Sequence, residues 1–194
     1  MDTSGSSTSR SLVARLKSRD EHAWERLVAL YGPLIYHWCR KCGLSPEDSA
    51  DTTQDTFGRV SSSIASFRRQ REGDTFRGWL WTITRNLVRD HTRSDQGVHA
   101  AGGTEMQQAL SSLVDDDLPP DENSPNSPMA DVVQRAMDAV RNDFNDQTWQ
   151  AFQLTVFQNH NATQAAEKIG MTPAAVRKAK SRVLQRLREE LGDL

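Results

Sequence analysis

Apolar residues recur at steps of three and four along most of the chain, which is the period of an amphipathic helix, and few stretches alternate as strands do. The first such pattern runs over Leu12–Cys39, with interruptions near Arg19-Asp20 and at Gly32-Pro33. Further helices are predicted from about Pro46 to Ile64 and from about Thr75 to Arg93. The residues of the second helix expected to face inward are Ala50, Thr53, Phe57, Val60 and Ile64.

The pattern changes between Ser94 and Pro128, where glycine, proline and acidic residues replace the apolar positions. Beyond this stretch, amphipathic helices are predicted over Asp131–Arg141 and Asp146–Gln158, followed by a basic pair of helices. The sequence therefore predicts an all-α protein of two small helical domains joined by a flexible acidic linker. The predicted parts are a disordered tail (1–9), a first domain (10–94), the linker (95–128) and a second domain (129–194).

Charge is distributed unevenly, although the 194 residues have a formal net charge of only −2. Residues 10–93 hold 15 Lys/Arg against 10 Asp/Glu, residues 94–161 hold 2 against 11, and residues 162–194 hold 7 against 4. Two basic segments thus flank an acidic one, and nucleic-acid binding depends on such local surfaces rather than on the total charge. With two cysteines, no long apolar run and no secretory signal, we expect a cytoplasmic protein without direct membrane insertion.

The segment Thr163–Val176 has the features of a helix-turn-helix. Ala166 is small enough for two helices to approach closely, Gly170 tolerates a positive φ at the turn, and Thr172 suits the N-cap of the second helix. That helix carries many cations, and in such motifs it enters the major groove of DNA. The alternative is an ordinary helical hairpin with a solvated charged face.

On the DNA-binding interpretation, Arg177 and Lys178 are placed to read bases, and the cations further along the helix are placed to hold phosphates. The complete predicted surface is Thr163, Thr172, Ala174, Arg177, Lys178, Ser181, Arg182 and Arg186.

The predicted helix over Thr75–Arg93 has a basic face that carries an aromatic residue. Aromatic rings set among cations suit unpaired nucleic-acid strands, because bases stack on rings while phosphates meet arginines. The alternative is that both tryptophans lie in the core, which is what we expect for Trp79. The positions on this face, at four-residue steps, are Arg77, Trp81, Arg85, Arg89 and Arg93.

Three segments in this order, Asp48–Phe57, Phe76–Asn86 and the helix-turn-helix, resemble a bacterial RNA polymerase sigma factor. The resemblance is to the extracytoplasmic-function (ECF) group, and it covers about residues 10–93 and 131–191. It implies an alternative sigma factor whose partners are core RNA polymerase, promoter DNA and an anti-sigma factor. Departures from the family pattern are Lys180, where an apolar residue is usual, and an unusually basic stretch over Arg68–Asp74.

The resemblance also implies roles for particular residues. The family's acidic helix docks on the clamp helices of the polymerase β′ subunit, and it corresponds here to Asp48, Asp51, Gln54 and Asp55; the alternative is a solubilising acidic face. The family's loop before the Trp79 helix captures a flipped base of the minus-ten element, while the helix-turn-helix reads the minus-thirty-five element as duplex. The minus-ten residues implied are Arg68, Arg69, Arg71, Thr75, Arg77, Trp81, Arg85, Asn86 and Arg89.

The cysteine pair is the remaining candidate for chemistry. Cys39 and Cys42 form a C-x-x-C with His37 nearby, so metal binding and redox sensing remain open alternatives to the core packing that we expect. No metal, cofactor, small-molecule substrate or enzymatic activity is predicted. Two rival functions stay open: a helix-turn-helix regulator that acts without core polymerase, and an anti-sigma decoy with a vestigial DNA motif.

Overall fold

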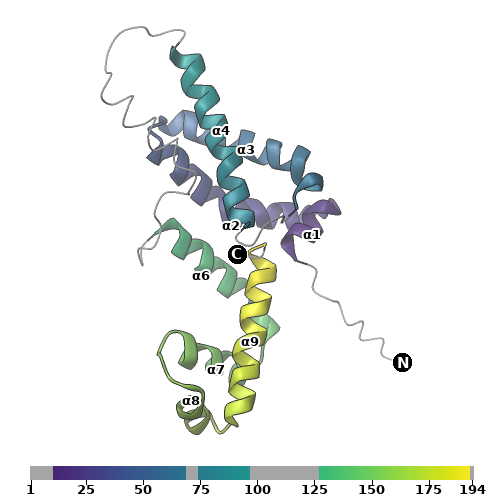
Figure 1. Ribbon diagram of the computed structural model, residues 1–194, viewed down its shortest axis with the longest axis vertical. Helices are drawn as coiled ribbons and strands as arrows, with labels where there is room; N and C mark the ends of the chain where they lie inside the picture. Colours follow the sequence, from purple (N-terminus) through teal and green to yellow (C-terminus); the bar gives the residue numbers. More distant parts are fainter. Residues whose placement is uncertain (1–10, 69–73, 97–126, 193–194) are drawn as a thin grey trace. The chain divides into compact units, whose positions relative to one another are not determined.

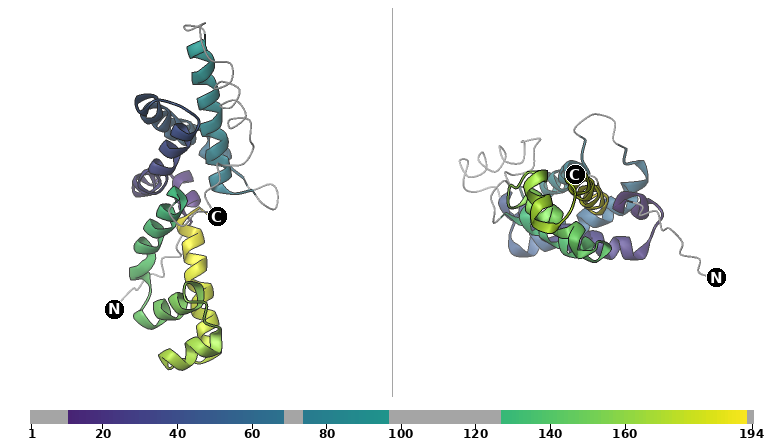
Figure 2. Two further views of the ribbon diagram at one scale, coloured as in Figure 1. Left: turned by 90° about the vertical axis from the view of Figure 1, so that its left-hand side faces the viewer. Right: turned by 90° about the horizontal axis from the view of Figure 1, so that it is seen from below.

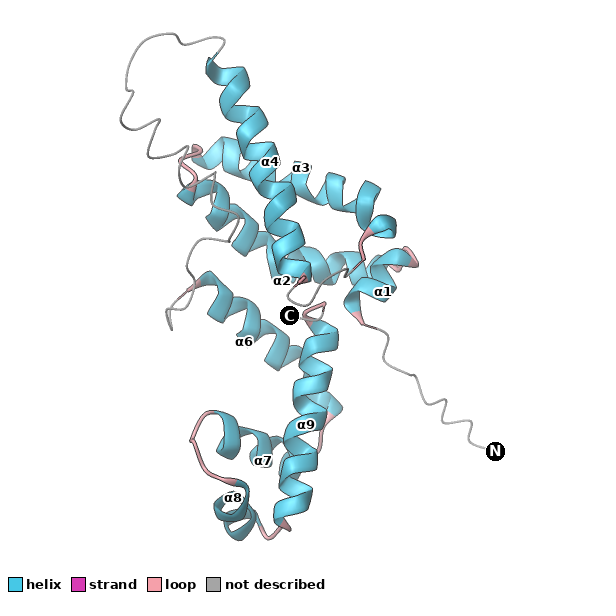
Figure 3. Cartoon of the chain, viewed as in Figure 1, coloured by secondary structure: helices cyan, strands magenta, loops and turns pink. Residues whose placement is uncertain are grey.

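The computed structural model describes residues 11–68, 74–96 and 127–192, and every regular element within these ranges is a helix (Figure 1, Figure 3). The predicted all-α class is confirmed. The chain divides into two compact units, an N-terminal unit mainly of Val13–Val133 and a C-terminal unit mainly of Gln134–Asp193. The predicted tail and most of the predicted linker lie outside the described residues. No helix in the described ranges is long and apolar enough to cross a membrane.

The N-terminal unit is built on three long helices that pack against one another: α2 (Glu21–Lys41), α3 (Pro46–Ser63) and α4 (Phe76–Gln96) (Figure 1, Figure 2). A short helix α1 (Leu12–Lys17) precedes them, and a single turn η1 (Ile64–Ser66) follows α3. The predicted break at Arg19-Asp20 is confirmed: Arg19 has a positive φ of 58°, and the Asp20 side chain caps α2 by accepting from the Ala23 N–H. Trp38 and Trp81 meet edge to face in the core.

The predicted interruption at Gly32-Pro33 is wrong, because α2 continues through Pro33. A proline inside a helix removes one backbone hydrogen bond and costs about 3 kcal/mol. Here Tyr31 and Leu34, on either side of the pair, are fully buried. Their packing offsets the cost of the proline and keeps the helix in one piece.

The inward side of α3 differs from the predicted one. Val60 and Ile64 are buried as expected, but Ala50 is exposed, and Thr53 and Phe57 are only half-buried. The buried positions in the first three turns are hydroxyl residues: Ser49, Thr52 and Thr56. The Thr56 Oγ1 donates to the Thr52 carbonyl at 2.8 Å and the Thr53 Oγ1 to the Ser49 carbonyl at 2.7 Å, so these hydroxyls are satisfied within the helix.

The C-terminal unit contains α7 (Asp146–Val156), α8 (Ala162–Ile169) and α9 (Pro173–Glu190), which all contact one another, together with most of α6 (Pro128–Val140) and the turn η2 (Arg141–Asp143). The two helices predicted ahead of the helix-turn-helix are confirmed as α6 and α7. The core of this unit between α7, α8 and α9 consists of small side chains: Ala151, Ala165, Ala166, Val176 and Ala179. Small side chains let the three helices approach closely.

Candidate nucleic-acid interfaces

A pocket of about 340 Å³ lies where η1 and the following residues meet the first turns of α4. We call it the Trp79 pocket; the residues that line it are Ser66, Phe67, Arg68, Asp74, Thr75, Gly78, Trp79 and Thr82. Trp79 is half-buried, with its ring 4.9 Å from that of Phe67 and 5.7 Å from that of Phe76. The pocket therefore combines an accessible aromatic ring with hydroxyls, the Arg68 cation and the Asp74 carboxylate, and its ring and hydrogen-bonding groups suit an unstacked base.

The start of α4 is fixed by a side-chain cap. The Thr75 Oγ1 accepts a hydrogen bond from the Gly78 N–H at 3.0 Å. A Cβ at Gly78 would lie 3.1 Å from that oxygen, so glycine allows the cap its close approach. Of the residues predicted before α4, Arg68 and Thr75 line the pocket, while Arg69 and Arg71 lie outside the described residues.

Trp79 and Trp81 exchange the buried and exposed positions that the sequence predicted for them. Trp81 is fully buried, with its ring 5.4 Å from that of Trp38, so its assignment to an exposed basic face is wrong. Trp79, which we expected in the core, is the ring at the surface of the pocket. The four-residue spacing predicted that Trp81 would share an exposed side with Arg77 and Arg85. The buried side of α4 is wide enough to include Trp81 as well; its residues are Phe76, Leu80, Trp81, Thr84 and Val88.

The other predicted residues of α4 remain at the surface. Arg77, Arg85 and Arg89 are half-exposed, and Asn86 is exposed. Asn86 borders a second hollow of about 320 Å³ between α3 and α4, which also includes Ile83 and Leu87. Along α4, the first hollow is lined by residues up to Thr82 and the second by residues from Ile83 to Asp90.

The acidic residues of α3 separate into two groups. Asp51, Gln54 and Asp55 are exposed, as predicted for a surface that meets basic partner residues. Asp48 instead makes contacts within the unit: its carboxylate accepts from the Ser45 Oγ at 2.6 Å and lies 3.2 Å from His91 Nε2. The Ser45 hydrogen bond and the His91 contact lower the pKa of Asp48.

The helix-turn-helix forms as predicted. Asn161 begins α8 with a capping box that includes Gln164, Gly170 ends the helix with a φ of 66°, and Thr172 caps α9 by accepting from the Ala175 N–H at 3.2 Å. Gln147 of α7 supports the turn by donating to the Ile169 carbonyl at 3.1 Å.

The exposed side of this motif is basic. The predicted residues that lie fully at the surface are Thr163, Thr172, Ala174, Arg177, Lys178, Ser181 and Arg182. Arg186, predicted as a phosphate contact, makes ion pairs within the unit: its Nε donates to Asp143 at 2.8 Å and its Nη1 to Glu190 at 3.0 Å. These ion pairs hold α9 to η2, so Arg186 serves the packing of the unit.

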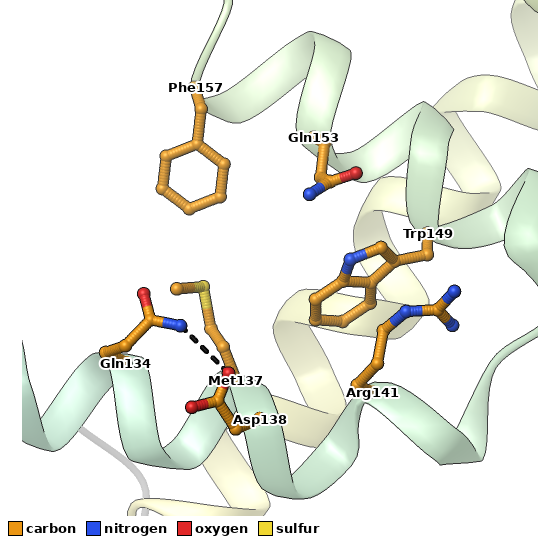
Figure 4. A pocket seen from close by; sticks show the side chains of 7 residues that line it. All are labelled: Gln134, Met137, Asp138, Arg141, Trp149, Gln153 and Phe157. Carbon is orange, nitrogen blue, oxygen red and sulfur yellow. Dashed lines mark hydrogen bonds between the residues drawn. The ribbon is translucent and has the colours of Figure 1, made fainter.

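A separate groove of about 320 Å³ lies between α6 and α7 (Figure 4). Met137, Trp149 and Phe157 form its apolar walls, and Phe157 is 56% exposed. At the rim, Gln134 donates to Asp138 at 2.9 Å, and the Arg141 guanidinium lies 5.3 Å from the Trp149 ring. The sequence did not predict this groove. The apolar pattern of each helix shows which side of that helix is buried, but the groove depends on how α6 packs against α7.

The cysteine pair is confirmed as part of the core. Cys39 is fully buried and Cys42 nearly so, and both are free thiols. Burial raises the pKa of Cys39 to about 12 and that of Cys42 to about 11, which disfavours the thiolate needed for metal binding or redox chemistry. Within the described ranges, no group of three or more potential metal ligands is found.

Several known proteins are similar in sequence to this chain. Residues 27–97 match the family model of sigma-70 region 2. The ECF RNA polymerase sigma factor BldN of Streptomyces coelicolor is 28% identical over 184 residues, which cover 94% of this chain and 65% of BldN. The ECF sigma factor SigE of Mycolicibacterium smegmatis is 34% identical over 71 residues, or 37% of this chain and 26% of SigE. The chain thus spans less than two thirds of the length of either relative.

A third relative matches over nearly its whole length: the RNA polymerase sigma factor CarQ of Myxococcus xanthus is 26% identical over 182 residues, which cover 94% of this chain and 97% of CarQ. Among solved structures, the RsbN–BldN complex matches with a TM-score of 0.37 at 22% identity, covering 90% of this chain and 96% of that one.

Proposed function

We propose that the chain is an RNA polymerase sigma factor of the ECF group, which binds core RNA polymerase and directs it to particular promoters. The match of residues 27–97 to sigma-70 region 2 supports a polymerase-binding first domain. The observation that carries the rest is the pairing, within one chain, of the Trp79 pocket with a capped helix-turn-helix. In this proposal the protein positions nucleic acid and performs no covalent chemistry.

The C-terminal unit is proposed to bind the minus-thirty-five element as duplex DNA. Arg177 and Lys178 lie exposed in the first turns of α9, the part of a recognition helix that reaches base edges. Arg182 lies about one turn further on and suits a phosphate contact. The caps at Asn161 and Thr172 fix the geometry of both helices before DNA binds.

The N-terminal unit is proposed to open the minus-ten element and to hold one unstacked base in the Trp79 pocket. Taking a base out of the stack costs a few kcal/mol, and stacking on an aromatic ring returns about 1–3 kcal/mol per base. Trp79 supplies that ring, Thr75 and Thr82 supply hydroxyls, and Arg68 supplies a positive charge at the edge. Asn86 and the half-exposed arginines of α4 extend the surface beyond the pocket.

Core polymerase is proposed to dock on the exposed acidic side of α3. Asp51, Gln54 and Asp55 lie within two turns of one another and are all exposed, so they present two charges and an amide to a basic partner such as the β′ clamp helices. Asp48 contributes indirectly in this scheme, since its contacts to Ser45 and His91 hold the start of α3 against α4. The proposed domains are residues 10–94 and 129–194, and residues 95–128 are the proposed acidic linker.

Regulation by an anti-sigma factor is part of the proposal. BldN, a relative over 94% of this chain, has been solved in complex with RsbN, and CnrH in complex with the cytosolic domain of CnrY. We propose that this chain likewise has a protein inhibitor that competes with core polymerase. A purified partner that prevents holoenzyme formation in a stoichiometric way would support this; a partner that binds the holoenzyme without displacing core would contradict it.

The proposed function is tested by reconstitution. The full chain is mixed with core polymerase, and promoters are selected from a fragment library and transcribed in run-off assays. We expect a stable holoenzyme and defined start sites. Sequence-specific DNA binding without any association with core would instead identify a regulator of the helix-turn-helix class, and absence of sequence preference with core present would identify a decoy.

The reading helix is tested in the same assay. Arg177→Ala with Lys178→Ala should weaken binding to the upstream element by about 1–3 kcal/mol for each bidentate hydrogen-bonding interaction with a base that the change removes. Arg188→Ala, a cation exposed near the far end of α9, is the matched control for the loss of charge. Unchanged transcription from a selected promoter in the double variant would exclude α9 as the reader.

A further inference from the structure

Lys17, the last residue of α1, reaches across the N-terminal unit to the edge of the Trp79 pocket. Its Nζ donates a hydrogen bond to the backbone carbonyl oxygen of Phe67, 50 residues further along the chain, at 2.7 Å. The same ammonium lies 5.7 Å from the centroid of the Phe67 ring, within cation–π range. One side chain therefore contacts both the backbone and the ring of a residue that lines the pocket.

Phe67 is the residue at which the chain leaves η1 and turns toward the segment before α4. Its N–H donates to the Ile64 carbonyl at 3.1 Å, and the residue is only 8% exposed. Its ring contacts Phe76 at 5.7 Å and Trp79 at 4.9 Å, so a shift of Phe67 moves the wall against which Trp79 rests. The orientation of its carbonyl also sets the direction in which Arg68 departs, because both groups belong to the same peptide unit.

The position of Lys17 has an electrostatic cost. Lys17 is exposed, yet partial desolvation and the neighbouring Arg68 cation both lower its pKa. The Nη1 of Arg68 donates to the same Phe67 carbonyl at 2.9 Å and to the Ala65 carbonyl at 2.6 Å, so two cations converge on one oxygen. Charged donors form stronger hydrogen bonds than neutral ones, and two of them hold this peptide unit in one orientation.

We infer that Lys17 is a positioning residue for base capture: it holds Phe67 so that Trp79 and Arg68 meet an unstacked base in a fixed geometry. The inference rests on the proposed role of the Trp79 pocket in the minus-ten element. Lys17 does not line the pocket, so it acts through Phe67 and not by contact with the strand. Sequence reasoning gave no sign of it, since Lys17 and Phe67 lie in different helical segments.

The test uses the full chain assembled with core polymerase and a forked promoter DNA that carries 2-aminopurine at single positions of the exposed strand. A flipped base gives a rise in fluorescence at one position. We expect Lys17→Met to lose most of that rise and to bind forked DNA about tenfold more weakly, as the loss of one charged hydrogen bond would predict. Core affinity and binding to upstream duplex should not change.

Two further variants separate positioning from other causes. Lys17→Arg keeps a cationic donor and should retain binding within about twofold of the wild type. Lys41→Met removes one exposed positive charge from the same unit, away from the pocket, and should leave the fluorescence unchanged. Thermal unfolding of each variant shows whether any loss reflects a failure to fold. If Lys17→Met unfolds, a loss of the fluorescence rise in a folded Lys17→Arg variant would still contradict the inference.

Three results would overturn the inference. The first is a wild-type fluorescence rise in Lys17→Met, and the second is an equal loss of that rise in Lys17→Met and Lys41→Met. The third is a loss in Lys17→Met together with a salt dependence of forked-DNA binding whose slope falls by about one, which indicates a direct phosphate contact. No rise in fluorescence at any position with the wild-type holoenzyme would instead contradict the proposed function of the pocket. Failure of the inference and failure of the proposed function are therefore distinguishable.

Discussion

Trp79 and Trp81 lie two positions apart on α4 and therefore face different surroundings. Trp81 is enclosed by the core and meets Trp38 edge to face, whereas Trp79 keeps part of its ring at the surface between Phe67 and Thr82. A large buried ring contributes mainly to stability, and an accessible one is free to stack on a ligand. The two residues should therefore respond differently to the same substitution.

We expect Trp81→Ala to destabilise the N-terminal unit by about 3–5 kcal/mol, because it removes a fully buried aromatic side chain. Trp79→Ala should cost less stability and should weaken forked-DNA binding by about 1–3 kcal/mol, the worth of one stacked base. Denaturant unfolding and forked-DNA binding by the holoenzyme measure the two effects. A Trp79→Ala variant with full affinity for forked DNA would remove the pocket from the proposed site.

Asp48 links stability to pH through a single carboxyl group. The Ser45 hydroxyl lowers its pKa first, and His91 adds to the effect. A carboxyl with a depressed folded-state pKa adds stability that is present above its ordinary pKa of 3.8 and is lost as the pH falls through the folded value. We expect Asp48→Asn to flatten the acid side of the stability profile, while Asp55→Asn, at an exposed position of the same helix, should not. Parallel acid profiles for Asp48→Asn and the wild type would contradict this.

At the scale of elements, the bounds of the helix-turn-helix follow from local residues, whereas the course of α2 and the buried side of α3 depend on tertiary packing. Gly170 ends α8 through its own left-handed conformation, and Thr172 begins α9 through a side-chain cap to a nearby backbone N–H. Both effects are local, so the motif was predictable from the sequence. Pro33 stays helical only because buried residues on both sides hold α2 together. The buried hydroxyl residues of α3 were not predicted either. Polar residues such as Thr52 and Thr56 are not expected in a core, and they can be buried here because the Thr56 hydroxyl bonds to the Thr52 carbonyl of the same helix.

In the candidate site too, features of a single helix were predictable from the sequence, and features that depend on packing were not. The cations of α9 and the acidic residues of α3 were predicted because exposed charge follows from helical spacing. The Trp79 pocket was not, since it depends on the contact between the Phe67 and Trp79 rings, which belong to different segments of the chain. Sequence spacing defines the sides of one helix, but a pocket between segments requires their packing.

Two glycines test this distinction between local conformation and packing. Gly170 has a φ of 66°, so Gly170→Ala should destabilise the C-terminal unit by about 1–2 kcal/mol, although no atom obstructs the new Cβ. Gly58 lies inside α3, and an alanine methyl there would meet nothing within 4 Å, so Gly58→Ala should stabilise the N-terminal unit by about 1 kcal/mol. Unfolding of the full chain followed by probes in each unit measures both. Stabilisation by Gly170→Ala would mean that the turn does not need a left-handed residue.

At the scale of the whole molecule, the proposed contacts with polymerase and with DNA lie in different parts of the chain. The acidic side of α3 belongs to the N-terminal unit, and the reading face of α9 belongs to the C-terminal unit. Substitutions at sites without shared partners usually contribute additively to stability and binding. Loss of core binding and loss of upstream DNA binding should thus be separable by mutation.

We therefore expect Asp51→Lys combined with Asp55→Lys to abolish association with core polymerase, because both changes place a positive charge where a basic partner is proposed to bind. Both side chains are exposed, so the fold should persist and upstream duplex DNA should still bind through α9. Glu47→Lys, an exposed acidic residue in the first turn of the same helix, is the control for charge reversal alone. Core affinity is measured by titration of labelled protein against core enzyme, and DNA binding by gel shift. Wild-type core affinity in the double variant would remove the acidic side of α3 from the interface and would leave the C-terminal unit as the first place to search for it.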